Sequence, residues 1–367
     1  MKAEARARLE RLLVAARRVA DPEAPEANER RAALAASSGL SRAGVELALA
    51  HCLETSPSEA ELAALCGSVE QAPRSHVLLS ANVFVAAHRA LALALAASPE
   101  VAVRASRREP EMTRCLAREA KGLFSVVETL APGAGEQVFA YGTAATLGEL
   151  ARTLPEGVRL LGHGPGFGLV VCYESALESA ELREQAAARL SFDMVLFDQR
   201  GCLSPRVVLF QGSQAGAERL ATALADALNG WEARVPLGQI SREERAECAR
   251  YAATLTYTGD IVPAGLGVIG ISPPGGAVLL PPAGRNLHVV PVTDALARAQ
   301  SLSAHVTTFS ICGEDALEAA LARTLPSARP ARLGSMQCPA FDGPVDRRAP
   351  TRSALTTFFD SLGRAEP

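Results

Sequence analysis

Apolar residues recur at helical spacing through the first 70 residues of the chain. Leu9 and Val19 fall on one face of the first expected helix. Another helix is expected to begin at Ser56, because Ser56 and Glu59 have the spacing of a capping box and Pro57 stands at the first helical position. The sequence therefore predicts a helical layer that packs against the rest of the chain.

From about His76 the pattern changes to short apolar runs that alternate with helical stretches. The first of these runs are typical of strands and lie at 76–80, 101–104, 137–141, 158–161 and 168–173. Further elements are expected as a helix over 179–190, a strand over 206–211 and a helix over 215–228. Such alternation indicates βαβ units and a largely parallel sheet.

The segment 265–284 is rich in Gly and Pro and predicts a long loop between two parts of a second α/β region. This region continues with strands over 287–292 and 305–312 and a helix over 314–325. Beyond about residue 329 the sequence predicts an irregular tail with a short terminal helix.

Composition places the chain among ordinary globular proteins, with 48% hydrophobic and 21% charged residues in 367. A net charge of −3 gives no attraction toward nucleic acid or an anionic membrane, so no nucleic-acid partner is expected. The only lysines are Lys2 and Lys121, and neither follows a glycine-rich turn. A phosphate-binding GxxxxGK[ST] loop is therefore absent, and Schiff-base chemistry has almost no candidate.

Apolar stretches are interrupted before they reach the length of a membrane span. His88 and Arg89 break the run at 83–97, and repeated Gly and Pro break that at 261–282. The amino terminus has no hydrophobic region of the kind found in signal peptides. Eight cysteines are scattered without a CxxC pair, which favours thiols in a reducing compartment over a disulfide framework or a zinc site. The sequence predicts a cytoplasmic protein without a metal site.

Cys202 is the strongest candidate for a reactive side chain. It lies between Gly201 and a short polar turn that ends in proline, where a buried apolar segment meets the next strand. Loops at strand ends often hold reactive groups, and Arg200 is a possible contributor to lowering the pKa of a thiolate. The alternative is a buried structural thiol.

Two glycine segments also follow expected strands. Gly142 and Thr143 precede a helix whose N–H groups can bind a pyrophosphate, although such turns also occur for purely conformational reasons. In 162–168 glycine takes every second position, so the backbone can approach a ligand closely, but the segment does not match GxGxxG. His163 lies within it as a candidate acid or hydrogen-bond donor, or as an incidental histidine in a structural turn.

Asn82 stands where an expected strand ends and an apolar helix begins. An asparagine at this place can cap the helix through its side-chain oxygen. Its NH2 group can instead donate to a developing oxyanion. The residues alone leave both roles open.

Together these segments resemble the acyl-CoA reductase family that includes the long-chain acyl-protein thioester reductase of bacterial bioluminescence, a branch of the aldehyde dehydrogenase superfamily. The most specific segment is FDQRGCLSP at 197–205, which is similar to the family's nucleophile motif. Supporting segments are SANV at 80–83, VRASRREP at 103–110, GHG at 162–164 and LGSMQCPAFDGP at 333–344. The resemblance covers roughly residues 75–345.

This resemblance implies an α/β fold of the aldehyde dehydrogenase type, with two Rossmann-type domains and a helical N-terminal layer. The implied division is a helical segment packing on the cofactor domain at 1–70, an NAD(P)-binding domain at 71–193, a catalytic domain carrying Cys202 at 194–328 and a C-terminal tail at 329–367.

The resemblance also implies residue roles. Cys202 would be the acyl-accepting nucleophile, and Asn82 would donate to the oxyanion beside the N–H of Cys202. His163 is the candidate proton donor, with His288 also available. Cofactor contacts are implied for Arg104, Ser106, Gly142, Thr143, Gly162 and Gly164. With Arg107 and Arg108 close to Arg104 in sequence, a 2′-phosphate can be accommodated, which favours NADPH while NADH remains possible.

Leu161 appears at the position where hydrolytic aldehyde dehydrogenases carry a glutamate that activates water. A missing base suits reduction of a thioester rather than its hydrolysis. The expected function is NADPH-dependent reduction of a fatty acyl thioester, on CoA or a carrier protein, to the aldehyde by a homo-oligomer. Ala81, Val83 and Phe84 depart from the family pattern, so two alternatives stay open: an aldehyde dehydrogenase forming the acid, and a non-catalytic nucleotide-binding scaffold.

Overall fold

The computed structural model describes residues 2–348, and its strands form two separate sheets, each in its own unit. Among the described residues, unit 1 combines residues 2–38, 49–165 and 340–348. Unit 2 combines residues 39–48 with residues 166–339. The break between Pro165 and Gly166 falls inside the segment 71–193 expected for the cofactor domain, because the strand that follows Gly166 pairs within the second sheet.

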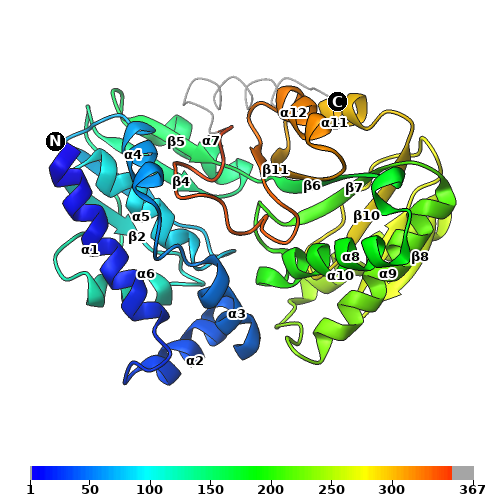
Figure 1. The fold of residues 1–367 in the computed structure, drawn as a ribbon. Helices are drawn as coiled ribbons and strands as arrows, with labels where there is room; N and C mark the ends of the chain where they lie inside the picture. The colour runs from blue at the N-terminus through cyan, green and yellow to red at the C-terminus, as the bar shows by residue number, and fades with distance from the viewer. Residues whose placement is uncertain (1, 349–367) are drawn as a thin grey trace. The chain divides into compact units, whose positions relative to one another are not determined.

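Unit 1 contains a parallel sheet of order β3-β2-β1-β4-β5 (Figure 1). Its strands are β1 (Arg74–Leu78), β2 (Glu100–Arg104), β3 (Ser125–Val126), β4 (Gln137–Tyr141) and β5 (Arg159–His163). The connecting helices are α5 (Ala86–Ala97), α6 (Glu111–Glu119) and α7 (Ala144–Thr153). The chain runs outward from β1 to β3 and then restarts at β4 on the other side of β1. The carboxyl ends of β1 and β4 therefore flank a topological switch point, where open α/β sheets bind ligands.

The N-terminal helical layer is confirmed. Its helices are α1 (Lys2–Ala20), α2 (Ala27–Ser38), α3 (Arg42–Cys52) and α4 (Glu59–Gly67). The capping box of α4 lies two residues later than predicted: Ser58 Oγ accepts from Glu61 N at 3.2 Å, and Glu61 Oε2 accepts from Ser58 N at 2.7 Å. Glu61, unlike Glu59, is the acid at the third helical position of this helix and can reach back to the cap.

Helix α5 is buried from Ala87 to Ala97, between the sheet and the N-terminal helices. Figure 1 shows α1 running alongside it. A helix that is apolar all round needs neighbours on every side, and α1, α4, β1 and β2 supply them. Of the two polar residues inside it, Arg89 donates from Nε to Glu54 at 3.0 Å, and Nδ1 of His88 lies 3.6 Å from the same carboxylate.

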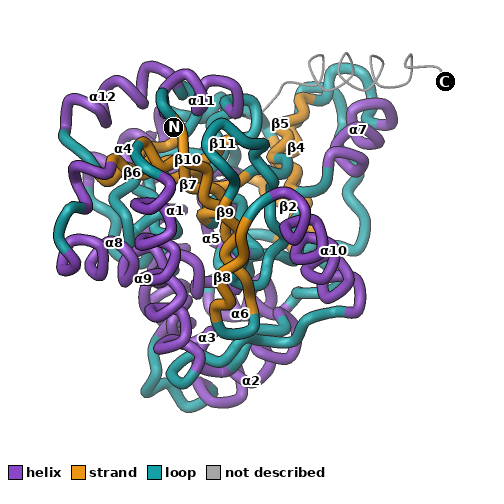
Figure 2. The backbone as a smooth tube through the Cα atoms, turned by 90° about the vertical axis from the view of Figure 1, so that its right-hand side faces the viewer, coloured by secondary structure: helices purple, strands orange, loops and turns teal. Residues whose placement is uncertain are grey.

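Unit 2 contains a seven-stranded sheet of order β12-β11-β6-β7-β10-β9-β8. The strands are β6 (Phe167–Tyr173), β7 (Pro205–Gln211), β8 (Asp260–Ala264), β9 (Gly267–Ile271), β10 (Leu287–Val292), β11 (Val306–Cys312) and β12 (Arg329–Pro330). All neighbours are parallel except β8 and β9, which form the antiparallel hairpin at one edge (Figure 2). Strands β6 and β10 are buried at every position, as expected of parallel strands covered on both faces.

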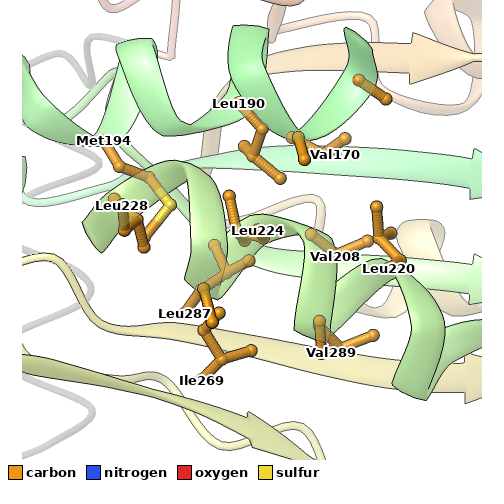
Figure 3. Packing of buried hydrophobic residues seen from close by; sticks show 14 of the residues in the cluster. Val170, Leu190, Met194, Val208, Leu220, Leu224, Leu228, Ile269, Leu287 and Val289 are labelled. Carbon is orange, nitrogen blue, oxygen red and sulfur yellow. The ribbon is translucent and has the colours of Figure 1, made fainter. Parts of the chain in front are cut away.

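Helices cover both faces of this sheet. Helices α8 (Ala180–Val195) and α9 (Gln214–Glu232) lie on one face, and α11 (Ala295–Leu302) and α12 (Asp315–Thr324) lie on the other (Figure 1). Figure 3 shows Leu190, Met194 and Leu224 of the first pair packed on Val208 and Val289 of the sheet. Helix α10 (Arg242–Thr258) packs on the β8–β9 hairpin.

The prediction of a long loop over 265–284 is wrong in its first part, which forms strand β9. Glycine stands in this strand for packing and not for a turn: a Cβ on Gly270 would lie 2.6 Å from the Oη of Tyr251 and 2.6 Å from a methyl of Leu255. The expected strands over 137–141 and 287–292 are confirmed as β4 and β10. The expected terminal helix lies outside the described residues.

Candidate active site

Several residues expected at the site lie along one edge of the unit 1 sheet. Neighbouring strands β2, β1, β4 and β5 are parallel, so their carboxyl ends meet there. The chain continues from these ends into Asn82, Arg104, Gly142 and His163. Unit 1 thus brings these four positions to one edge, and Cys202 belongs to unit 2.

Asn82 is exposed in the bend between β1 and α5. The capping role weighed from the sequence is not present, because the N-cap of α5 is Val85 and no side chain bonds to that helix end. The N–H of Leu79 donates to the carbonyl of Arg104 at 3.1 Å, which fastens the start of the bend to the end of β2. The amide of Asn82 therefore projects from an anchored loop without serving as a cap.

Gly142 and Thr143 form the turn between β4 and α7. Thr143 is the N-cap, and its Oγ1 accepts from the N–H of Thr146 at 3.3 Å. The N–H of Gly142 donates to the carbonyl of His163 at 3.2 Å, which joins the ends of β4 and β5. The conformational role is thus present, and the exposed N-terminus of α7 is also the kind of helix end that binds phosphate.

Arg104 closes β2 and is half-buried, and the exposed Arg107 and Arg108 follow it. The hydroxyl oxygen of Ser106 accepts from the N–H of Arg108 at 3.2 Å, so Ser106 shapes this turn. Buried Glu109 accepts from the N–H of Met112 at 3.0 Å at the start of α6. Three arginines therefore stand at or just after the end of β2, on a turn that hydrogen bonds hold in place.

His163, the last residue of β5, is buried and stacks on Tyr141 with ring centroids 4.6 Å apart. Burial lowers the pKa of His163 to about 4, while the charge of Asp346 acts in the opposite direction. The imidazole is therefore neutral near pH 7. Gly162 is buried and pairs in register with Ala140 of β4. Gly164 follows the end of β5, and a Cβ added to it would lie 3.5 Å from a methyl of Leu147.

His288 lies in β10 with both ring nitrogens engaged. Nε2 of His288 lies 2.9 Å from the hydroxyl oxygen of Ser272, which donates to the carbonyl of Ala277 at 2.7 Å. Nδ1 lies 2.9 Å from the hydroxyl oxygen of Tyr251, which donates to the carbonyl of Leu287 at 3.0 Å. Burial lowers the pKa of His288 to about 4, so the ring is neutral near pH 7.

Cys202 lies in the turn between the 3₁₀ helix η2 (Leu196–Gln199) and β7. Cys202 is half-buried and is not part of a disulfide. The N–H of Gly168 in β6 donates to the carbonyl of Ser204 at 2.7 Å, and the N–H of Ser204 donates to Gly201 at 3.1 Å. A Cβ on Gly168 would stand 2.6 Å from the carbonyl oxygen of Leu203, so only glycine allows this strand to approach the turn so closely.

The backbone before this turn is left-handed at three successive residues, none of them glycine. Their φ angles are 56° at Phe197, 49° at Asp198 and 60° at Gln199. Such a conformation costs roughly 1–2 kcal/mol per residue, less for aspartate. Arg285, far along the chain, is left-handed too, with φ 64°. Strained backbone of this kind persists only where the surroundings hold it.

Arg200, which the sequence offered as a possible contributor to a lowered thiol pKa, contacts the segment that leads into α10. Its Nη2 donates to the carbonyl of Gln239 at 2.5 Å, and its Nε lies 3.4 Å from a carboxylate oxygen of Glu244. This guanidinium consequently ties the turn to the segment before α10.

The resemblance segment 333–344 has a structural explanation in its first half. The carboxylate of buried Asp193 accepts from the N–H of Gly334 at 2.6 Å and of Met336 at 2.9 Å. Burial raises the pKa of Asp193 to about 7. Gln337 then donates to the hydroxyl of Ser204 at 2.7 Å, so the segment supports the turn that carries Cys202.

Sequence reasoning missed the residues that hold this turn, namely Gly168, Asp193, Asp198, Arg285 and Gln337. Asp198 and Gln337 lie inside segments quoted for the resemblance. No local sequence pattern predicts that Asp198 contacts Arg285 or that Gln337 contacts Ser204. Among the described residues no cluster of metal-binding side chains occurs, and no helix there has the length and apolar character to cross a membrane.

Solved structures similar to this chain include aldehyde dehydrogenases. Lactaldehyde dehydrogenase from Escherichia coli has 16% identity and a TM-score of 0.65, over 90% of this chain and 79% of that one. An NAD-dependent aldehyde dehydrogenase from Sinorhizobium meliloti has 17% identity and a TM-score of 0.65, over 92% and 75%. At this identity the likeness defines the fold, and it confirms the expected aldehyde-dehydrogenase-like α/β class. No curated protein sequence matches the chain.

The fold therefore places the protein in the aldehyde-dehydrogenase-like α/β class. Within that class, the sequence model of the acyl-CoA reductase (LuxC) family matches residues 66–337. The chain belongs to the acyl-CoA reductase (LuxC) family, as the resemblance implied. Membership makes it an enzyme and implies a nicotinamide cofactor and an acyl-CoA substrate.

Proposed function

We propose that this enzyme reduces a fatty acyl thioester to the aldehyde, with Cys202 as nucleophile and NADPH as reductant. The thiolate of Cys202 attacks the carbonyl carbon, the carbon–sulfur bond to CoA or a carrier thiol breaks, and that thiol leaves with a proton. The cofactor, when bound, supplies the hydride. The resulting thiohemiacetal on Cys202 collapses to aldehyde and restores the thiolate. A cytoplasmic homo-oligomer is the expected form.

The observation that carries this proposal is the position of Cys202, half-buried on a heavily hydrogen-bonded turn in a member of the acyl-CoA reductase family. Leu161 supports reduction over hydrolysis, because the apolar side chain at this place in β5 cannot activate water. Asn82 is the proposed side-chain donor to the oxyanion, supported by its exposure and by its lack of a capping role. His163 is proposed to act as a hydrogen-bond donor through the N–H of its ring, which is neutral near pH 7.

The residues at the edge of the unit 1 sheet fit a dinucleotide. The switch point between β1 and β4 is bordered by the exposed N-terminus of α7, which suits a pyrophosphate at Gly142 and Thr143. Gly162 and Gly164 let the chain pass close to a ligand, and Ser106 shapes the neighbouring turn. Arg104, with two further arginines just beyond β2, supports NADPH over NADH, because guanidinium groups bind phosphate.

The test uses acyl-CoA of several chain lengths with NADPH and with NADH. Wild-type enzyme should release free CoA in a burst before NADPH is added, and should then oxidise NADPH and form aldehyde. In Cys202→Ala both signals should fall by about 10³-fold or more, because the nucleophile is gone. CoA release and NADPH absorbance are the measurements.

Cys66, half-buried in α4, provides the matched control, and Cys66→Ala should retain wild-type turnover. Ordinary turnover by Cys202→Ala would refute the proposal. Acid formed from aldehyde and NAD(P)⁺ without a thiol acceptor would favour an oxidative aldehyde dehydrogenase. Nucleotide binding without any turnover across chain lengths would indicate a scaffold.

A further inference from the structure

The residues just before the Cys202 turn are fixed by a buried ion pair. Asp198 Oδ1 accepts from Nε of Arg285 at 3.1 Å and from Nη2 at 2.8 Å, and each side chain is 4% exposed. A planar guanidinium that donates two bonds fixes the angle of its partner as well as its distance. The side chain of Asp198 therefore has a defined orientation.

Further bonds hold the same residue from other directions. The second carboxylate oxygen of Asp198 accepts from the N–H of Gly238 at 3.0 Å, and its own carbonyl accepts from the N–H of Gly284 at 3.0 Å. Arg285 in turn donates from Nη1 to Glu232 of α9 at 3.1 Å. Asp198 is thus linked to two other segments of unit 2, and its left-handed conformation is maintained by them.

The ends of the Cys202 turn are also bonded to each other. Nε2 of Gln199 donates to the carbonyl of Pro205 at 2.8 Å and to that of Asn286 at 2.8 Å. In the other direction, Nη2 of Arg206 donates to the carbonyl of Gln199 at 2.8 Å. These bonds cross the base of the turn, so its backbone follows the position of Gln199.

We propose that Asp198 and Arg285 are positioning residues for Cys202: their buried ion pair holds the left-handed backbone at 197–199 and thereby sets the direction of the Cys202 thiol and N–H. This proposal rests on the proposed function, in which Cys202 is the nucleophile. Asp198 and Arg285 act through the turn and touch neither substrate nor cofactor. The arrangement predicts an effect on the chemical step and not on ligand binding.

Asp198→Asn tests the ion pair. Asparagine keeps the side-chain volume and readily adopts the left-handed conformation, but it carries no charge for Arg285 to bind. We expect kcat for acyl-CoA reduction to fall about 10²-fold, since small displacements of a reacting group have effects of this size. KM for acyl-CoA and NADPH should stay within about twofold. Alkylation of Cys202 by iodoacetamide, followed by mass spectrometry across a pH series, should show an altered rate profile.

Glu54→Gln is the matched control, because it removes the acidic partner of the buried Arg89 in unit 1. Both variants should lower the thermal unfolding temperature, but Glu54→Gln should keep the wild-type kcat and the wild-type alkylation profile of Cys202. If Asp198→Asn behaves like this control, the pair is merely structural and the positioning role is refuted.

Arg285→Lys provides a second variant that keeps the positive charge and loses the two-pronged geometry. It should show a smaller loss of kcat than Asp198→Asn, with KM again unchanged. Failure of both variants to fold would make the pair a folding determinant and overturn the positioning role. A wild-type enzyme that never acylates Cys202 would overturn the proposed function instead, and the alkylation profiles would still decide whether the pair positions this thiol.

Discussion

His163 and His288 are both buried with a pKa lowered to about 4, yet their ring nitrogens meet different surroundings. Both ring nitrogens of His288 lie 2.9 Å from a hydroxyl oxygen, that of Tyr251 or that of Ser272. A proton leaving or entering that ring would break this network. His163 instead stacks on Tyr141 at the sheet edge where the cofactor is proposed to bind. Of the two histidines, His163 is the better candidate for a hydrogen bond to a bound ligand.

The lowered pKa of His288 predicts acid destabilisation. Between about pH 6.5 and pH 4 the unfolded chain binds a proton at this residue and the folded chain does not, so stability is present above this window and is lost as pH falls through it. The contribution is on the order of 3 kcal/mol. In His288→Gln, urea unfolding at a series of pH values should show a shallower loss on acidification.

His305→Gln, at an exposed position, serves as the control and should keep the wild-type dependence on pH. An unchanged slope in His288→Gln would show that this histidine does not titrate in the window.

Residues for which a chemical role is proposed could be picked out in the sequence where a short motif surrounds them, as for Cys202, Asn82 and Gly142. Asp198 and Arg285 were not visible, because their contact joins positions 87 residues apart. The left-handed backbone at Phe197 could not be predicted either, because no glycine stands at this position. It arises from hydrogen bonds with distant parts of the chain, which no local pattern encodes.

Among the elements, strands were easiest to predict where one buried run is bounded by turn residues. Strand β10 was placed at its observed limits for this reason. Strand β9 was missed because two of its five residues are glycine, and glycine ordinarily signals a turn. At Gly270 a side chain would meet Tyr251 and Leu255 of α10, and at Gly267 it would meet the backbone of Gly284 and Arg285.

Strand β6 also requires glycine for close packing, at Gly168 beside the Cys202 turn. In Gly168→Ala the new methyl would lie 2.6 Å from the Leu203 oxygen and 2.8 Å from Cε of Met336, so strand or turn must move. We expect a loss of about 1–3 kcal/mol in the free energy of unfolding, together with a lower kcat. Urea titration and steady-state kinetics measure the two effects.

Gly230 in α9 offers a contrast within unit 2, because a Cβ there meets no atom within 4 Å. Gly230→Ala should raise stability by roughly 0.5–1 kcal/mol. Equal stability changes in the two alanine variants would contradict the packing argument for Gly168.

At the scale of the whole molecule, the chain returns to unit 1 after completing unit 2. Arg89 donates to the carbonyls of Ala340 at 2.7 Å and Gly343 at 2.8 Å, and the N–H of Phe341 donates to Glu61 at 2.9 Å. The ring of Phe341 is buried under Arg89. The alternation of elements predicted βαβ units and a largely parallel sheet, but it did not predict this return, because the contacts join distant parts of the sequence.

Phe341→Ala should destabilise unit 1 by about 3–5 kcal/mol, since a buried aromatic ring is lost. Amide hydrogen exchange should rise in α4 and α5, while β7 and α9 of unit 2 keep their protection. Tyr257→Ala, at a side chain that is 91% exposed, should change little. Faster exchange spread evenly over both units would contradict a local role for this ring.

Unit 1 is built from separate segments of the chain, which affects when it can fold during synthesis on the ribosome. Unit 2 has all its residues once position 339 has emerged, whereas unit 1 waits for Phe341 although most of it was made earlier. At about 5–20 residues per second, that delay is on the order of ten seconds or more. During this interval the surface that Phe341 will cover is open to water, and a chaperone that binds nascent chains would find it there.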